Sequence, residues 1–397
     1  YAAEASTLSM WLSEHQMNVK FQEELFVLPE TLPLKQSGHI VCGNACRLDW
    51  NTVCPHTPEE EVYIMGNPPY LGSKLQEAIQ KDDMKVALSD VKDKKGVDYI
   101  AAWFWKGAKY IKESKAKYAF VTTNSISQGE QVAMLWKPIF DLGLEIFYAR
   151  TSFKWSNNAK YNAAVTVAII GVGNKNNIQK LLFNEQENKA YKVDNINPYL
   201  SASDNVIVAK TYNIPHGLPK AEFGCMPYDN GHLLLSESEK NSLLEKYPES
   251  DIFIKRIMGS HEFLNDIRRY CLWIDDDKRE EAENIPLLRE RIAATKDFRL
   301  NESKDGASLA NRPHQFREHY VINEDSKGKV IIPSVSSERR IYIPIGYVDK
   351  DTVISNLAFA VYGAEKWLFA LLTSRMHNLW VRTVGGRLKT DYRYSAT

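Results

Sequence analysis

The sequence lacks any apolar run long enough to span a membrane, which takes about 20 residues. It also shows no signal peptide at its start. Neither sign of charge is in excess, because Lys+Arg and Asp+Glu both number 50, so the total charge indicates no partner. Cysteine is scarce: five residues, an odd number, are scattered over 397 positions, which is typical of a reducing compartment. We therefore expect a globular cytoplasmic protein with no membrane partner.

Metal-binding pairs of the CxxC type are missing as well. Cys42, Cys46, Cys54 and His56 lie close enough in the sequence to suggest zinc, but their spacing is not that of a standard site. Cys42 also falls in an apolar, strand-like run, where a buried free thiol is the more common finding. We expect buried free thiols and no metal.

The first half of the chain alternates strands and helices. Apolar patterns predict strands over residues 39–42, 61–65, 118–126, 144–153 and 162–173, helices over 2–20, 97–114 and 129–143, and a polar, mobile excursion over 71–96. This alternation predicts an α/β fold, with a parallel sheet covered by helices on both faces and a closing hairpin. Ligands bind beyond the carboxyl ends of the strands in such sheets, where Asn44, Asn67 and Asn124 are expected.

From about residue 206 the pattern changes, because helices and short strands mix, arginine becomes frequent and the alternation ends. We therefore predict two domains, residues 1–205 and 206–397, of which the second is α+β and includes a helix over 367–388. Residues 327–397 contain eleven Lys and Arg against five Asp and Glu, a net charge of +6. This segment is a candidate for contact with a polyanion, and an ordinary solvated surface is the alternative.

The stretch Gly66-Asn67-Pro68-Pro69-Tyr70 follows the predicted strand 61–65. The two prolines fix two φ angles and remove two backbone donors, and Pro68 biases Asn67 toward an extended backbone. In this stiff loop the Asn67 amide oxygen and the Pro68 carbonyl can accept both hydrogens of an amine, while Tyr70 lies against a flat ring. An ordinary Asn-Pro turn is the alternative interpretation.

Asn67-Pro68-Pro69-Tyr70 resembles the NPPY motif of class I, S-adenosylmethionine-dependent amino-methyltransferases, above all the DNA adenine-N6 enzymes. The chain resembles more closely the MmeI-like type IIG (also called type IIL) restriction–modification proteins, which combine methyltransferase, target recognition and an N-terminal nuclease in one polypeptide. The matching stretches span almost the whole chain: "LSMWLSEHQMN" (8–18), "IVCGNACRLDW" (40–50), "GNPPYLG" (66–72), "FVTTNSISQGEQVAMLW" (120–136), "FKWSNNAKYNAAVTVAIIG" (153–171), "RRYCLWI" (268–274), "IPSVSSERRIYIP" (332–344) and "SRMHNLWVRTVGGRLKTDYRYS" (374–395).

The resemblance implies a class I (Rossmann-like) methyltransferase sheet in residues 1–205 and a target recognition domain in 206–397. The glycine-rich cofactor loop of the family is missing, since no FxGxG or DPxxGxG occurs, and the chain starts without Met inside a helix pattern. We therefore expect an incomplete sheet in a fragment that lacks the cofactor-loop and nuclease segments of its parent and is inactive alone. Glu113-Ser114-Lys115 has the ExK form but stands at a helix end, so we do not interpret it as a nuclease site.

The resemblance also assigns roles to the loop. Asn67 and Pro68 would accept the amine hydrogens of an adenine that has flipped out of the duplex, Pro69 would keep the loop rigid, and Tyr70 would stack on the base. Further candidates are Phe153 and Trp155 for base stacking, with core packing as the alternative, and Asn44 for contact with S-adenosylmethionine. Related enzymes usually have Asp at the position of Asn44.

The second domain would read a specific sequence in double-stranded DNA of a bacterial cell. Arginine is a common reader of base edges, and the candidates are Arg268, Arg269, Arg312, Arg339 and Arg340, each with an ion pair inside the fold as the alternative. Two other functions stay open: a DNA-binding module whose catalytic half is vestigial, and an RNA or protein amino-methyltransferase. The large domain after residue 206 argues against the last of these.

Overall fold

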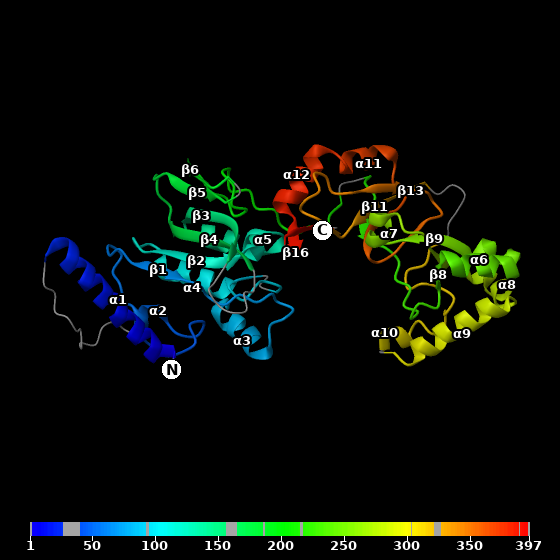
Figure 1. Cartoon of the computed structure of the whole chain (residues 1–397), viewed down its shortest axis with the longest axis horizontal. Helices are drawn as coiled ribbons and strands as arrows, with labels where there is room; N and C mark the ends of the chain where they lie inside the picture. The colour runs from blue at the N-terminus through cyan, green and yellow to red at the C-terminus, as the bar shows by residue number, and fades with distance from the viewer. Residues whose placement is uncertain are drawn as a thin grey trace. The chain divides into compact units, whose positions relative to one another are not determined.

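The structure is a computed structural model that describes residues 2–26, 40–92, 95–155, 165–185, 187–214, 217–302, 304–320, 327–388 and 390–395. The chain forms two compact units, residues 1–209 and 210–397, which are described separately (Figure 1). The domain boundary expected from the sequence lies four residues earlier. Within the described ranges, no helix combines the length and the apolar composition needed to cross a membrane.

Unit 1 contains a six-stranded sheet and a set of helices. Its helices are α1 (Ala2–Leu25), α2 (Trp50–Val53), α3 (Ala78–Ala87), α4 (Ala101–Ile111), the 3-10 helix η1 (Asn124–Ser127) and α5 (Glu130–Asp141). Its strands are β1 (Tyr63–Gly66), β2 (Lys117–Thr123), β3 (Leu144–Trp155), β4 (Val165–Asn174), β5 (Lys180–Asn184) and β6 (Lys189–Val193).

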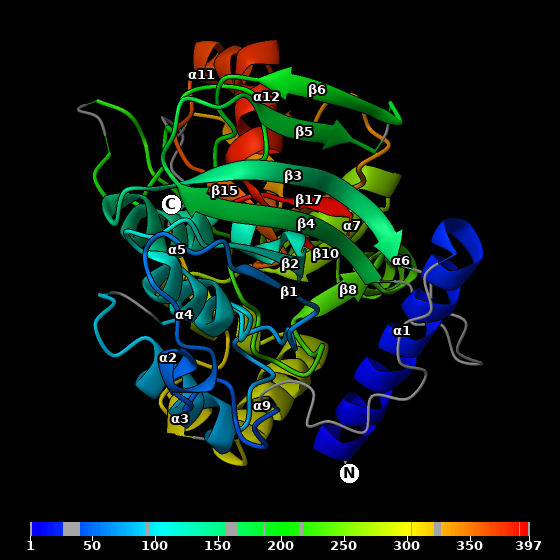
Figure 2. The same cartoon turned by 90° about the vertical axis from the view of Figure 1, so that its left-hand side faces the viewer.

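The sheet of unit 1 has the strand order β1-β2-β4-β3-β5-β6 (Figure 2). β1 runs parallel to β2, β4 runs antiparallel to both β2 and β3, and β3 runs parallel to β5. The α/β fold class is confirmed. The two strands of the expected closing hairpin are β3 and β4, which pair antiparallel. β4 also lies between β2 and β3, so the sheet is mixed rather than parallel up to the hairpin. A strand that follows another without a crossover helix must return in the opposite direction.

Aromatic side chains join the sheet to α4. β2 alternates buried and half-buried residues, so Tyr118 and Phe120 point to the same face, where both rings lie edge-on to Phe104 of α4. Gly107 lets helix and strand approach closely, since a Cβ atom at this position would lie 3.0 Å from the Tyr118 ring. Burial of these rings contributes about 1.5–3 kcal/mol for each large side chain.

Two expectations for unit 1 are wrong. The excursion at 71–96 contains α3, whose buried face includes Met84 and Ala87 while Lys81 and Lys85 are exposed. This helical period was hidden by the many charges of its solvent face. The strand expected over 39–42 is absent from residues 40–42, which have no regular structure, and His39 lies outside the described residues.

Unit 2 mixes short strands and helices, as expected. Its helices are α6 (Glu237–Lys246), η2 (Pro248–Phe253), α7 (Ser260–Asn265), η3 (Asp276–Lys278), α8 (Arg279–Glu283), α9 (Pro286–Leu300), α10 (Lys304–Ala307), α11 (Lys366–Leu372) and α12 (Arg375–Val384). Its strands are β7 (Ala221–Phe223), β8 (Leu234–Ser236), β9 (Ile254–Met258), β10 (Arg269–Leu272), β11 (Lys329–Pro333), β12 (Val335–Ser336), β13 (Gly346–Val348), β14 (Val353–Ile354), β15 (Ala358–Val361), β16 (Gly386–Leu388) and β17 (Asp391–Arg393).

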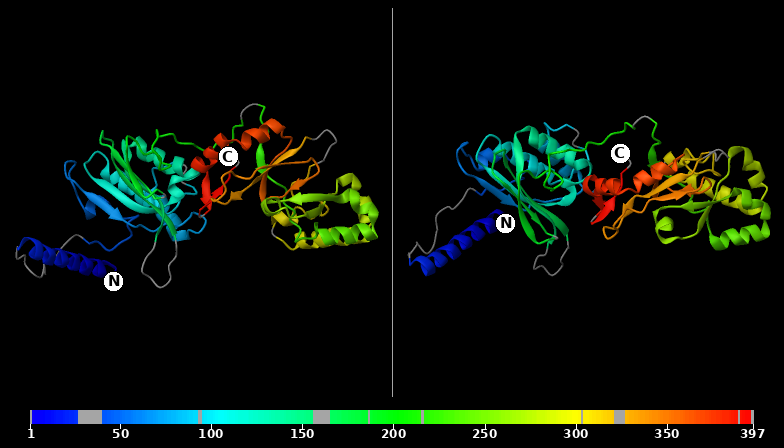
Figure 3. Two further views of the ribbon diagram at one scale, coloured as in Figure 1. Left: turned by 45° about the horizontal axis from the view of Figure 1, so that its top comes forward. Right: turned by 90° about the horizontal axis from the view of Figure 1, so that it is seen from above.

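The strands of unit 2 form three small sheets, with the orders β14-β9-β10-β8, β13-β11-β15-β7 and β12-β17-β16. The green and yellow helices α6, α8 and α9 lie at one end of the unit, and the red helices α11 and α12 lie at the other (Figures 1 and 3). The helix expected over 367–388 is two helices, because Ser374 caps α12 by accepting a hydrogen bond from the His377 N–H (3.2 Å) and thereby starts a new helix.

Candidate functional site

Three strand ends of unit 1 meet at one edge of its sheet. β1, β2 and β3 all point the same way, because β4 is antiparallel to both of its neighbours. Asn67 follows β1, Asn124 follows β2, and Ser152 lies near the end of β3. The Asn124 amide donates a hydrogen bond to Ser152 Oγ (2.5 Å), while the buried Asn124 Oδ1 has no hydrogen-bond partner among the described residues. This edge therefore exposes polar side chains where α/β sheets bind ligands.

The loop after β1 presents its polar groups outward. Asn67 and Pro69 are exposed, Pro68 is buried, and Tyr70 is half-buried against the core of the unit. Within the described part of the chain, the Asn67 side chain has no hydrogen-bond partner, so its amide oxygen is available to a ligand. The four motif residues thus combine a fixed backbone with one free acceptor and one aromatic ring.

Asp98 connects this loop by hydrogen bonds to the segment that follows β2. Its carboxylate is buried and accepts hydrogen bonds from the Leu71 N–H (2.9 Å) and from Ser125 Oγ (3.2 Å). Leu71 directly follows the motif, and Ser125 belongs to η1 after β2. The Tyr99 N–H adds a bond to the Leu71 carbonyl (3.0 Å), and the buried Gln76 amide donates to the same carbonyl (2.9 Å). The sequence interpretation missed Asp98, whose only local signal was a carboxylate just before an apolar helix.

Asn44 lies in a turn, and both polar atoms of its side chain form a hydrogen bond. Its Nδ2 donates to Asp83 Oδ2 (2.9 Å), and its Oδ1 accepts the Cys46 N–H (2.9 Å). Asp83 also accepts hydrogen bonds from Tyr99 Oη (2.7 Å) and Arg47 Nε (2.6 Å). Although burial by itself raises the pKa of Asp83, these donors outweigh it and hold the pKa of the carboxyl below its usual value. The Asn44 amide is thus held in place and keeps one N–H and one acceptor lone pair on an exposed residue.

We expect the Asp83 network to give unit 1 a stability that depends on pH. The lowered pKa of Asp83 stabilises the fold above the unfolded pKa of about 3.9, and this contribution is lost as the pH falls through the folded pKa. At pH 7 Asp83→Asn should lower the free energy of unfolding by about 1.5–3 kcal/mol. Urea titrations between pH 7 and pH 3 would measure this, with Asp194→Asn as control, because Asp194 is exposed and lies outside this network. A difference between the two variants that does not shrink toward pH 3 would contradict the assignment.

Phe153 and Trp155 lie on the same face of β3, with ring centroids 6.2 Å apart, and both are half-buried. The Arg150 guanidinium lies 4.5 Å from the centre of the Phe153 ring. Half-buried rings of this kind fit neither a purely structural role in the core nor full exposure to a ligand. Their stacking on a flipped base therefore stays a prediction.

The five candidate arginines of unit 2 form two groups, according to whether the guanidinium has a partner among the described residues. Arg268 pairs with Glu237 (3.1 Å), Arg269 pairs with Glu262 (3.2 Å), and Arg312 donates to the Arg317 carbonyl (2.6 Å). Arg339 and Arg340 form the other group, described next.

Arg339 and Arg340 are exposed, and no partner for either guanidinium is found among the described residues. They follow β12, which pairs with β17 and through it with β16. Arg387 of β16 and Arg393 of β17 belong to the same small sheet. This sheet and the residues after β12 therefore bring together four arginines of the basic segment 327–397.

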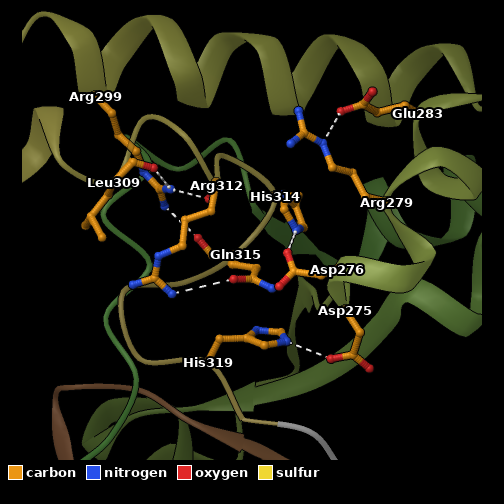
Figure 4. Close-up of polar contacts among 10 residues, drawn as sticks. All are labelled: Asp275, Asp276, Arg279, Glu283, Arg299, Leu309, Arg312, His314, Gln315 and His319. Carbon is orange, nitrogen blue, oxygen red and sulfur yellow. Dashed lines mark hydrogen bonds and ion pairs between the residues drawn. The ribbon is translucent and has the colours of Figure 1, made fainter.

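A buried arginine organises the loop before residue 320. Arg299 is fully buried and donates hydrogen bonds to five backbone carbonyls, those of Pro227, Tyr228, Leu309, Arg312 and Gln315. The same loop carries His314, which bonds Asp276 (2.9 Å), and His319, which bonds Asp275 (2.7 Å) (Figure 4). The backbone of this loop and that of Pro227 and Tyr228 are thereby fixed to the end of α9.

The cysteines are free. Cys46, Cys225 and Cys271 are buried, but Cys42 and Cys54 are exposed, so the expectation of buried thiols is wrong for these two. Burial raises the pKa of Cys46 to about 11. In the described ranges, no group of three or more His, Cys, Asp or Glu is placed to hold a metal ion.

Comparison with known proteins gives consistent matches over nearly the whole chain. The family model "MmeI, DNA-methyltransferase domain" matches residues 1–184, and "MmeI, target recognition domain" matches residues 202–397. DNA methyltransferase A of Bacillus subtilis (strain 168) is 46% identical over 399 residues, which are 100% of this chain and 45% of that protein.

One solved structure is also similar, that of the type IIL restriction-modification enzyme MmeI in complex with DNA. It is 38% identical with a TM-score of 0.80 and covers 99% of this chain and 53% of that one. The chain thus spans about half the length of these two relatives. Because the two matched models together account for almost all of its residues, this chain belongs to the MmeI family, and its two parts match that family's DNA-methyltransferase and target recognition domains.

Proposed function

We propose that this protein transfers a methyl group from S-adenosylmethionine to N6 of an adenine that flips out of a specific sequence in double-stranded DNA. One observation carries the proposal: Asn67-Pro68-Pro69-Tyr70 lies at the carboxyl edge of the sheet with the Asn67 side chain exposed and available. Membership of a DNA-methyltransferase family supports the reaction class. A restriction–modification protein of the bacterial cytoplasm, with nuclease and cofactor-loop segments in the same polypeptide, is the setting that we propose.

Methyl transfer to the adenine amine needs hydrogen-bond acceptors held in fixed positions more than it needs a strong base. The exocyclic nitrogen of adenine is a poor nucleophile because its lone pair is delocalised into the ring. Asn67 Oδ1 and the Pro68 carbonyl would each accept one amine hydrogen, which favours a pyramidal nitrogen with a localised lone pair. Pro69 keeps both acceptors in place, and Tyr70 would stack on the base at a gain of about 1–3 kcal/mol. S-adenosylmethionine would supply an electrophilic methyl group.

The proposed cofactor contact of Asn44 would use the remaining capacity of its side chain. Nδ2 donates one hydrogen to Asp83 and Oδ1 accepts the Cys46 N–H, which leaves one N–H and one lone pair on an exposed residue. These two bonds would hold the amide in place for S-adenosylmethionine, and the contact stays a prediction.

The test uses the full-length gene product with methyl-labelled S-adenosylmethionine. Duplex DNA, single-stranded DNA, ribosomal RNA and a glutamine-containing peptide would be offered separately, and the digested products identified by mass spectrometry. We expect N6-methyladenine in duplex DNA only. Label in RNA or peptide would favour the alternative amino-methyltransferase, and DNA binding without label would favour a specificity module with no catalysis of its own.

Asp98 should be a positioning residue for this reaction. Asp98→Ala removes the acceptor that joins the Leu71 N–H to Ser125, and small displacements of reacting groups cost large factors, so we expect methyl transfer to slow by about 100-fold. Asp98→Asn keeps an oxygen acceptor for Leu71 and should retain most activity. Turnover number, Michaelis constant for DNA and circular dichroism should be measured together. A folded Asp98→Ala protein with normal turnover would contradict this role.

Sequence choice should reside in unit 2. Arg339→Ala or Arg340→Ala should relax one position of the recognition site, at a cost of about 1–3 kcal/mol for that position. Arg268→Ala is the matched control, because Arg268 already pairs with Glu237. Neutralising the Lys and Arg of 327–397 together should weaken binding to all sequences and reduce its salt dependence. Sequencing of methylated sites in cells that carry each variant would decide. Unchanged sites in both arginine variants would refute them as readers.

A further inference from the structure

Unit 2 contains a cavity of about 390 Å³ that the proposed methyl transfer does not use. Its lining combines aromatic rings, two carboxylates and amines, and consists of Glu222, Phe223, Cys225, Glu318, His319, Tyr320, Lys327, Lys329, Tyr362 and Gly363. Small-molecule sites have this composition, with apolar and aromatic walls and a few convergent polar groups.

Lys329 is the most unusual group in the lining. Its side chain is buried, and its ammonium group donates to Tyr320 Oη (2.5 Å) and to the Thr352 carbonyl (2.8 Å). No carboxylate forms an ion pair with it among the described residues, and burial lowers the pKa of Lys329 to about 8. An ammonium group has three donors, so one remains for a ligand. A buried cation without a counter-charge is costly, and an acceptor in the cavity would reduce this cost.

Aromatic rings surround the ammonium group. It lies 4.6 Å from the centre of the Tyr320 ring and 5.9 Å from that of Tyr362, and these two rings lie 5.1 Å apart. At the cavity, Phe223 is 61% exposed, although Phe359 lies beside its ring (4.4 Å). An exposed phenyl ring next to a cavity gives a flat ligand apolar surface to cover.

Other lining residues are held in place by partners outside the cavity. The His319 ring stacks on Trp273 (4.2 Å). It also bonds Asp275 (Figure 4), and the two contacts together fix this wall. The Glu318 carboxylate accepts the Met226 N–H (2.9 Å) and pairs with Arg317 Nε (3.3 Å). It keeps further acceptor capacity, since a carboxylate has about four acceptor sites. Glu222 is exposed and lies 4.0 Å from Lys220. The cavity therefore offers one buried donor and carboxylate acceptors between aromatic rings.

We propose that this cavity binds a neutral, planar heterocycle whose ring carbonyl stands beside ring N–H groups, with guanine as the nucleobase of this chemistry. The carbonyl would accept the third hydrogen bond of Lys329, the N–H groups would donate to Glu222 or Glu318, and Phe223 and Tyr362 would cover the ring faces. The formal charges of the lining cancel, because Lys327 and Lys329 balance Glu222 and Glu318, so the cavity favours a neutral base over an anionic phosphate. Adenine lacks the carbonyl and fits less well.

Calorimetric titration of the chain tests this with guanosine, adenosine, guanosine 5′-monophosphate and a single-stranded trinucleotide with a central guanine. We expect saturable guanosine binding with a dissociation constant below about 1 mM, and affinity about tenfold higher than for adenosine or the monophosphate. If the trinucleotide binds more tightly than guanosine, the natural ligand is a guanine of a DNA strand. If guanosine binds more tightly, the natural ligand is the free nucleoside. No saturable binding, or equal affinity for guanosine and adenosine, would overturn the proposal.

Variants locate the binding within the cavity. Lys329→Met and Phe223→Ala should each weaken guanosine binding about tenfold. The matched controls are Lys296→Met on α9 and Trp380→Ala on α12, which are exposed and outside the lining, and these should bind as the parent does. If Lys329→Met fails to fold, Phe223→Ala and Glu222→Gln decide, because both positions are exposed. Unchanged affinity in these variants would refute the site.

Discussion

Asn67→Ala should reduce methyl transfer by the full-length protein about 100- to 1000-fold or more, the range found when one preorganised polar group at a reacting centre is removed. The side chain is exposed at the carboxyl edge of the sheet, so its loss removes an acceptor without opening a cavity in the core. Stability and DNA affinity should stay near the parental values, because neither the core of unit 1 nor unit 2 is touched. The loss should appear in the turnover number.

The measurement combines label transfer from S-adenosylmethionine, a binding isotherm on cognate duplex and the fluorescence of 2-aminopurine at the target position. Asn51→Ala is the control, since Asn51 is also exposed but lies on α2. In Tyr70→Ala the turnover should fall less, while the fluorescence that reports stacking should change. Parental turnover in Asn67→Ala would disprove the assigned chemistry, whatever the result for Tyr70.

Arg299→Met should destabilise unit 2 by about 3–5 kcal/mol, which is the usual cost when a buried charged group loses its partners or leaves them unpaired. The arginine is fully buried and satisfies five carbonyl groups that face the end of α9. Methionine fills part of the volume but donates nothing, so all five carbonyls lose a donor. Burial lowers the pKa of Arg299 to about 10, so the guanidinium is still charged at neutral pH.

Urea unfolding followed by tryptophan fluorescence would measure the change, because Trp273 stacks on His319 of the same loop. Arg289→Met is the matched control on the same helix, since Arg289 is exposed. We expect the control to lie within about 0.5 kcal/mol of the parent. A loss for Arg299→Met no larger than this would show that water replaces the guanidinium as donor.

Features that depend on neighbouring residues in the chain could be predicted from the sequence. Two adjacent prolines after an apolar strand restrict the backbone wherever they occur. The strand before them was expected over 61–65, and β1 spans Tyr63–Gly66. The break in pattern near residue 206 likewise gave two parts, and the structure forms two units that meet at 209/210. Helices and strands with strong periodicity, such as α4 and β2, were placed to within a few residues.

Interactions between distant segments were decided only by the tertiary structure. The sequence did not show that the Asp98 carboxylate accepts hydrogen bonds from Leu71 and Ser125. It did not show that Asn44 donates a hydrogen bond to Asp83. Nor did it show that Arg299 donates to five carbonyl groups of two loops. It also left Arg268 and Arg339 indistinguishable, although only the first has an ion-pair partner in the described chain. Such contacts depend on which strands and loops become neighbours in space, and a single polar residue carries no periodic signal that reveals its partner. The sequence alone therefore determined where the proline-rich loop at Asn67 lies, and the fold determined what holds it in place.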